Sequence, residues 1–208
     1  MLDAAFAIPG DLHAATGGYR YDREVLAHLP AFGVNGHHLA LPGSFPVPTD
    51  EDLTLTRQLL GQLHPATPIL FDGLAYGALP PDILAQLRSP IVALVHHPLA
   101  LETGLDAEQR ARFMISERAA LDQAHAVVVT SPLTAATLTR DFQVKPGKLT
   151  IAEPGTEPAL RATGTGAPFT MLTVGSIIPR KGYLGLIEAL ATLSDPDWHL
   201  IIAGSPEH

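Results

Sequence analysis

The 208-residue sequence contains no cysteine and very few lysines, and it has no long uninterrupted apolar run. The absence of cysteine excludes a disulfide framework, a thiolate nucleophile and cysteine-ligated zinc. No stretch approaches the roughly 18 apolar residues of a membrane span, and the N-terminal segment MLDAAFAIPG lacks the basic region of a signal peptide. We therefore expect a soluble, cytoplasmic protein.

Charge is also scarce, because only 16% of the residues are charged. Thirteen basic residues stand against 21 acidic ones, which gives a net charge of −8, and the only lysines are Lys145, Lys148 and Lys181. No block of basic residues is present, which argues against a nucleic-acid partner and against a polybasic membrane anchor. Apolar residues make up 46% of the chain, enough for a well-buried core.

Short apolar runs recur along the chain, and each is followed by a polar or glycine-containing turn and a helical pattern. The runs are Ala4–Ile8, His38–Leu41, Ile69–Phe71, Ile91–Val95, Ala126–Val129 and Leu149–Ala152. They are continuously apolar, as expected for strands buried on both faces of a parallel sheet. Helix-start signals lie between them: Thr49 with Asp52, Asp106 with Glu108, and Ser131 before Pro132. The sequence predicts an α/β, Rossmann-like, doubly wound parallel sheet.

Small and polar residues between Arg161 and Pro168 predict an inter-domain linker. Beyond it the pattern restarts, with strands at Met171–Val174 and Leu200–Ala203 around a helix at Gly182–Leu193. We expect an N-terminal domain over residues 1–160, a linker over 161–168 and the first βαβ unit of a second Rossmann-like domain over 169–208.

The predicted helix of the second domain is apolar around most of its circumference, with Tyr183, Ile187 and Leu190 among its side chains. Such a helix needs more cover than one βαβ unit supplies. We therefore expect that the second domain is incomplete at His208 and that this segment can mediate self-association.

Polar and glycine residues follow the predicted strands, at the sheet edge where open parallel sheets bind ligands. These candidate site residues are Gly17, Gly18, Tyr19, Asp72, His96, His97, Ser131, Ser176, Arg180 and Lys181.

Three of these groups have a specific chemical interpretation, and each has a purely structural alternative. Gly17-Gly18 allows backbone N–H groups to approach an anion at a helix start, or forms only a tight turn. Arg180-Lys181 before a helix N-terminus suits a diphosphate, or is a solvated basic pair. His96-His97 ends a strand, where a histidine can donate a hydrogen bond or transfer protons, or can be a capped structural residue.

Other site types have no motif here. The glycines do not form G-x-G-x-x-G, and neither G-x-S-x-G nor a Walker A sequence occurs. The carboxylate nearest to His96-His97 is Glu102, which is not in the H-E-x-x-H register of a zinc site. We expect neither a metal nor another cofactor.

In their order along the chain, five motifs resemble those of family-4 (group 1) retaining glycosyltransferases, which have the two-domain GT-B fold. They are Thr16-Gly-Gly, Val95-His96, Val127-Val-Val-Thr-Ser131, Glu153-Pro-Gly-Thr-Glu157 and Val174-Gly-Ser-Ile-Ile-Pro-Arg-Lys-Gly182. The resemblance spans nearly the whole chain, and its most specific element is V-G-x-x-x-P-R-K-G between a strand and a helix.

The resemblance implies metal-independent transfer of a sugar from a nucleoside-diphosphate-sugar donor, with retention at the anomeric carbon. The acceptor is a glycan, a lipid or a small molecule, and no covalent nucleophile is required. By similarity the Gly17-Gly18 loop lies against the donor phosphate and acceptor, and His96, or less favourably His97, contacts the transferred sugar. Arg180 and Lys181 neutralise the leaving diphosphate.

The chain departs from this family in two respects. Ser176 stands where many members have arginine, so that Arg180 alone carries that role. The nucleoside-recognising segment and a pair of glutamates would lie beyond His208, so we expect the 208-residue chain alone to have no transferase activity. Two alternatives stay open, namely a non-catalytic binding or assembly module of the same fold and a sugar-nucleotide epimerase. The sugar, the nucleotide and the acceptor are not specified by the sequence.

Overall fold

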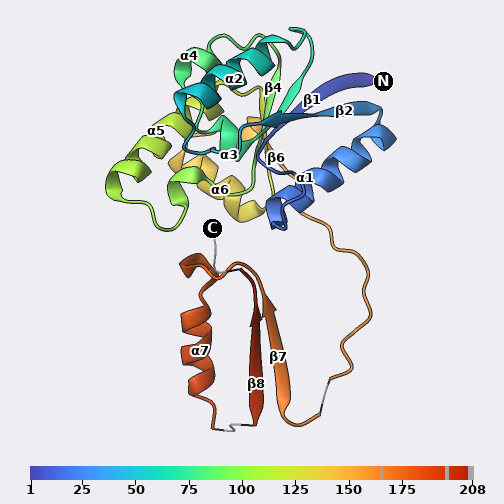
Figure 1. The fold of residues 1–208 in the computed structure, drawn as a ribbon, viewed down its shortest axis with the longest axis vertical. Helices are drawn as coiled ribbons and strands as arrows, with labels where there is room; N and C mark the ends of the chain where they lie inside the picture. Colours follow the sequence, from blue (N-terminus) through green and yellow to red (C-terminus); the bar gives the residue numbers. More distant parts are fainter. Residues whose placement is uncertain (165, 195–196, 206–208) are drawn as a thin grey trace. The chain divides into compact units, whose positions relative to one another are not determined.

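The computed structural model describes residues 1–164, 166–194 and 197–205. The chain divides into two compact units, Met1–Gly155 and Thr156–His208 (Figure 1). Residue 165 of the expected linker and the expected chain end at His208 lie outside the described residues. From 152 to 168, the described residues form neither helix nor strand.

The first unit is built on a six-stranded parallel sheet with the strand order β2-β1-β3-β4-β5-β6. Its strands are β1 (Leu2–Pro9), β2 (Val34–Leu41), β3 (Ile69–Asp72), β4 (Ile91–Val95), β5 (Ala126–Val129) and β6 (Leu149–Ile151). Each apolar run of the sequence lies in one of them, except that Ala152 follows the end of β6, and the prediction of a Rossmann-like α/β sheet is confirmed.

Helices connect the strands. They are α1 (Gly17–His28), α2 (Asp50–Gly61), α3 (Gly73–Tyr76), α4 (Pro81–Leu84), α5 (Ala107–Gln123) and α6 (Pro132–Asp141), with short 3₁₀ helices η1 (Leu29–Phe32), η2 (Leu99–Leu101) and η3 (Pro146–Lys148). Thr49 and Asp52 form a capping box at α2, as their spacing predicts. At α5 Asp106 is the N-cap and Glu108 lies in the first turn, as predicted, and Gln109 completes a capping box with Asp106. Within the described residues, no helix is long and apolar enough to cross a membrane.

Two hydrophobic clusters cover the two faces of the sheet, because alternate side chains of a strand point to opposite faces. Phe6 and Ile8 of β1 pack with side chains of α1, whereas Ala7 belongs to the larger cluster on the other face. Figure 1 shows α1 set apart from the group formed by α2 to α6. The sheet is therefore wound on both faces, as expected.

The strand order places a topological switch point between β1 and β3. The chain leaves β1 for β2 on one side, and from β3 it proceeds to β4, β5 and β6 on the other. In open parallel sheets, ligands bind beyond the carboxyl ends of the strands at such a point. Pro9, Asp72 and Val95 mark the carboxyl ends of the three strands concerned.

Gly73 allows α3 to pass directly over the end of β4. A Cβ atom at this position would lie 2.9 Å from the carbonyl oxygen of Leu94 and 3.4 Å from Cα of Val95. We expect Gly73→Ala to lower the free energy of unfolding by about 1–3 kcal/mol, as other overpacked sites do, and the measurement is urea unfolding. Gly61→Ala is the control, because a Cβ there meets nothing within 4 Å. Equal stability of the two variants would contradict the prediction.

The second unit is a single βαβ arrangement. It contains β7 (Phe169–Val174), the 3₁₀ helix η4 (Pro179–Lys181), α7 (Tyr183–Ala191) and β8 (Trp198–Ala203), and the two strands are parallel. In α7, Leu190 is buried but Leu184 is 71% exposed and Ile187 46%. Because these apolar side chains are exposed, we keep self-association through this segment as a prediction.

Candidate functional site

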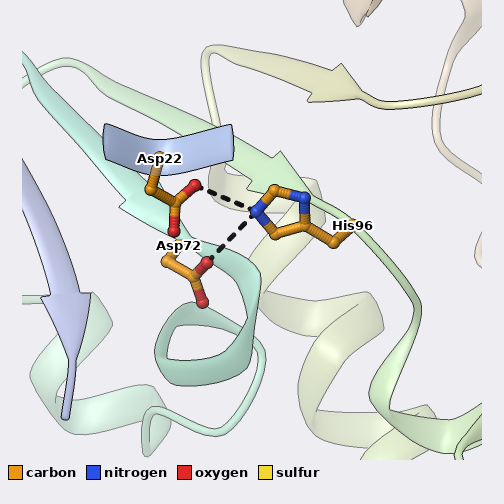
Figure 2. Close-up of side chains that lie close together, drawn as sticks. All are labelled: Asp22, Asp72 and His96. Atoms are coloured by element: carbon orange, nitrogen blue, oxygen red, sulfur yellow. Dashed lines mark hydrogen bonds and ion pairs between the residues drawn. The ribbon is translucent and has the colours of Figure 1, made fainter. Parts of the chain in front are cut away.

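Three polar side chains meet beside the switch point: Asp22 from α1, Asp72 from the end of β3 and His96 directly after β4. Nε2 of His96 lies 3.0 Å from Oδ1 of Asp22 and 3.6 Å from Oδ2 of Asp72 (Figure 2). Both aspartate side chains are almost fully buried, and the histidine side chain is 24% exposed. We call these three residues the aspartate–histidine cluster.

Burial and neighbouring charges together set the electrostatics of the cluster. Burial and the negative charge of Asp22 raise the pKa of Asp72 to about 7, although His96 and the backbone N–H of Leu74 act in the opposite direction. Burial lowers the pKa of His96, but the hydrogen bond and charge of Asp22, with the charge of Asp72, outweigh burial and raise this pKa.

Neighbouring groups fix the position of the His96 ring. The ring of Tyr21 meets it edge to face, with ring centroids 5.3 Å apart and an interplanar angle of 83°, and the Tyr21 hydroxyl donates to the carbonyl of Ala152. On α1, Gly18 lies so near that an added Cβ would be 3.5 Å from Cδ2 of His96. Gly18 and His96, which the sequence places 78 positions apart, are therefore neighbours.

The loop between β1 and α1 is held by side chains of α1. Gly17 and Gly18 begin the helix, and the Thr16 hydroxyl accepts from the backbone N–H of Tyr19 as the N-cap. Tyr19 donates its hydroxyl to the carbonyl of Pro9, 2.8 Å away, and the Arg23 guanidinium donates to the carbonyls of Leu12 and Ala14. These hydrogen bonds hold the start of α1 in place next to the aspartate–histidine cluster.

A buried glutamate holds the segment that follows His96. Glu117 of α5 accepts from the backbone N–H groups of Leu99 and Ala100, at 3.1 Å and 3.4 Å. Burial raises the pKa of this carboxyl to about 7, and the two N–H groups oppose that rise. Its side chain passes Gly77, where an added Cβ would be 3.1 Å from Cγ of Glu117. Glu117 was not among the residues singled out from the sequence.

Ser131 and His97, which the sequence also singled out, lie at the same edge of the sheet but form no hydrogen bond to the aspartate–histidine cluster among the described residues. Ser131 caps α6, where its Oγ accepts from the backbone N–H of Thr134 at 3.0 Å. Nε2 of His97 is buried without a hydrogen-bond partner among the described residues. His96, not His97, is therefore the histidine that the structure builds into the aspartate–histidine cluster.

Ser176, Arg180 and Lys181 belong to the second unit. Ser176 follows β7, and Arg180 and Lys181 form the end of η4. Gly182 has a φ of +68° and links η4 to the start of α7, a conformation that glycine adopts without strain. Both cations are exposed and stand immediately before a helix N-terminus, as predicted.

The same cluster also meets the distance requirement for a metal site, because one ligand atom from each residue lies within 4.8 Å of the others. The contact between His96 and Asp22 nevertheless has the length of an ordinary hydrogen bond. A proton satisfies that contact, and we assign no metal to the cluster.

A comparison with protein-family models finds no match to this sequence, and a comparison with curated proteins finds none either. The assignment of a function therefore depends on the site itself and on the sequence motifs.

Asp22 is the functional candidate that the sequence analysis missed. It lies on the buried face of α1, three positions after Tyr19 and three before Val25, and both of these pack on the sheet. An aspartate at an apolar position of an amphipathic helix is the available signal, since buried aspartates are rare unless paired. Its partner, His96, is 74 residues away in the sequence.

Proposed function

We propose that this protein is a retaining glycosyltransferase that transfers a sugar from a nucleoside-diphosphate-sugar donor. The observation that carries the proposal is His96, an imidazole that is hydrogen-bonded to buried Asp22, lies close to buried Asp72 and is partly exposed beside the switch point of the sheet. This edge is where Rossmann-like sheets bind nucleotides and related ligands. The five sequence motifs supply the reaction class.

In this proposal the first unit contacts the sugar and the acceptor. His96 forms a hydrogen bond to a hydroxyl group of the transferred sugar, and the backbone N–H groups at the start of α1 face an anionic group of the donor. Gly18 has no side chain to obstruct that approach, and a Cβ added there would lie 3.5 Å from the His96 ring. Tyr19 and Arg23 keep the loop in place through their bonds to backbone carbonyls.

The second unit supplies positive charge for the leaving group. Arg180 and Lys181 stand before the N-terminus of α7, where backbone N–H groups add to their positive potential. Negative charge develops on the diphosphate as the bond to the sugar breaks, and fixed cations stabilise that charge. Donor cleavage by this route needs no covalent nucleophile and no metal.

Removal of either cation tests the proposal. In a form of the protein that shows acceptor-dependent turnover, we expect Arg180→Ala and Lys181→Ala each to slow release of nucleoside diphosphate by about 100- to 1,000-fold. Acceptor binding should change little, because the charge matters most as the diphosphate leaves. The assay uses UDP-, GDP- and ADP-sugars with and without acceptors. Arg110→Ala and Lys145→Ala are matched controls in the first unit, and both wild-type residues are exposed.

The same assay separates the alternatives. Epimerised or hydrolysed donor without any acceptor would favour a sugar-nucleotide epimerase. No turnover of any donor, together with no binding of sugar nucleotides to the 208-residue chain, would favour a binding or assembly module. Near-wild-type turnover in both cation variants would identify Arg180 and Lys181 as ordinary surface charge.

A further inference from the structure

The burial of Asp22 needs an explanation, because an unpaired ionised carboxylate inside a protein is strongly unfavourable. Its side chain is 1% exposed, and its Oδ2 is buried without a hydrogen-bond partner in the described part of the chain. The next residue, Arg23, donates to the carbonyls of Leu12 and Ala14 instead of to Asp22. The only cationic side chain that contacts Asp22 among the described residues is His96.

The contact between Asp22 and His96 determines which ring nitrogen carries a proton. Nε2 faces two carboxyl groups, which are acceptors when ionised, so Nε2 is the protonated nitrogen in both charge states of the ring. Only the 3.0 Å contact with Asp22 is short enough for a hydrogen bond, and the 3.6 Å contact with Asp72 is not. Asp22 is therefore the residue that sets the tautomer.

The other nitrogen of the ring is left for a ligand. Figure 2 shows Nδ1 on the side of the imidazole away from both carboxyl groups. Nδ1 has no hydrogen-bond partner among the described residues, and the side chain is 24% exposed. Tyr21, edge-on at 5.3 Å, holds the ring plane, so that the direction of Nδ1 is fixed as well.

We propose that Asp22 is a positioning residue for His96, which holds the Nε2 proton so that Nδ1 is presented to a hydroxyl group of the bound ligand. Asp72 supports this arrangement as a neutral carboxylic acid that shares a hydrogen bond with the Asp22 carboxylate. That the hydroxyl belongs to a sugar rests on the proposed function, whereas the state of the histidine ring does not.

The charges around the cluster agree with this arrangement. Burial and the charge of Asp22 favour the protonated form of Asp72, whose pKa is raised, and the hydrogen bond between the two carboxyl groups acts in the same direction. The remaining titratable groups that act on the cluster or its neighbours are Tyr19 and Tyr21 on α1, Asp11 and His13 in the loop before it, and His38 on β2. Burial raises the pKa of both tyrosines, so they are neutral at physiological pH.

The experiment is nitrogen-15 NMR of histidine-labelled 208-residue chain across pH, which reports the proton on each ring nitrogen without any substrate. The His96 signals are assigned by their loss in His96→Gln. We expect Nε2 to stay protonated and Nδ1 to lose its proton as pH rises. In Asp22→Asn the midpoint of that loss should move down by about 1–3 pH units, because an adjacent opposite charge is removed.

Two further variants keep the test decisive. Asp11→Asn removes an exposed carboxylate nearby and should leave the His96 midpoint in place, while unchanged signals of the other histidines show that each variant is folded. Asp72→Asn retains a donor toward Asp22, and Nε2 should remain the protonated nitrogen. A wild-type ring protonated on Nδ1 alone at high pH, or an Asp22→Asn midpoint equal to that of the wild type, would overturn the proposal.

Added Zn²⁺ or Mn²⁺ provides a separate outcome. Stoichiometric binding of either ion that displaces the Nε2 proton and is lost in Asp22→Asn would replace positioning with metal binding, and no such binding supports the proposal. The expected tautomer combined with failure to bind any sugar nucleotide would reject the proposed function and leave the role of Asp22 intact. Binding of a sugar nucleotide by a chain whose neutral His96 ring is protonated on Nδ1 would reject the role of Asp22 and leave the proposed function intact.

Discussion

Replacement of Glu117 by alanine is expected to lower the free energy of unfolding by about 3–5 kcal/mol, because it leaves a cavity and two buried N–H groups without an acceptor. Glu117 is only 1% exposed, and its carboxylate accepts hydrogen bonds from the backbone N–H groups of Leu99 and Ala100 at the start of η2. These residues come directly after His96-His97-Pro98. We therefore expect the segment that follows β4 to loosen along with the overall loss of stability.

Urea unfolding followed by circular dichroism measures this effect. Circular dichroism is used because the only tryptophan, Trp198, belongs to the second unit, whereas Glu117 belongs to the first. Glu108→Ala on the same helix is the control: Glu108 is exposed in the first turn, and its loss should change stability by less than about 1 kcal/mol. Glu117→Gln keeps one acceptor oxygen, so its free energy of unfolding should lie between those of Glu117→Ala and Glu108→Ala. An alanine variant as stable as the control would show that the two N–H groups have other partners.

Asp72→Asn is expected to stabilise the protein above pH 7 and to have little effect below about pH 4. The pKa of Asp72 is raised from 3.8 in model compounds to about 7 in the folded chain. Between these two values the folded state holds a proton that the unfolded chain has released, so wild-type stability falls as pH rises through this window. The buried charge is absent in the asparagine variant. Its advantage at pH 8 is on the order of 4 kcal/mol, since one pKa unit corresponds to about 1.4 kcal/mol.

The measurement is the difference in unfolding free energy between Asp72→Asn and wild type from pH 4 to pH 8. Glu117, whose pKa is also raised to about 7, is present in both proteins and cancels in the difference. The N-cap bond to the Leu74 N–H can be kept, because an asparagine oxygen also accepts. Asp122→Asn, at an exposed position, should show a difference independent of pH over this range. A pH-independent difference for Asp72→Asn would mean that Asp72 is ionised in the fold at neutral pH.

The elements of the first unit were predictable because their signals are local. Uninterrupted apolar runs such as Ile91–Val95 indicate strands buried on both faces, and each run was confirmed as a strand. Thr49 with Asp52 and Ser131 with Pro132 also form the helix starts that their spacing predicts. At α5 the sequence placed the acidic residues Asp106 and Glu108 at the helix start, and the structure confirms both, but the reciprocal bond from Gln109 was not predicted because it depends on side-chain reach.

The aspartate–histidine cluster was only partly predictable. Asp72 and His96 follow strands, and residues after parallel strands share one edge of the sheet, so their proximity follows from the fold. Asp22 follows no strand, since it lies on the inner face of α1. Its role becomes visible only when α1 is packed on the sheet and its carboxylate is 3.0 Å from His96.

The amino-acid sequence by itself determined the alternation of strands and helices, the polar edge of the sheet and the cationic helix start at Arg180-Lys181. Those properties follow from hydrophobic period, capping residues and turn chemistry, which act over a few neighbouring positions. The tertiary structure alone decided that His96 and not His97 joins the cluster, that Asp22 holds it, and that Asp72 and Glu117 have raised pKa values. Each of these depends on burial and on charges brought together from distant parts of the chain, and long-range packing is what removes the water that would otherwise screen them.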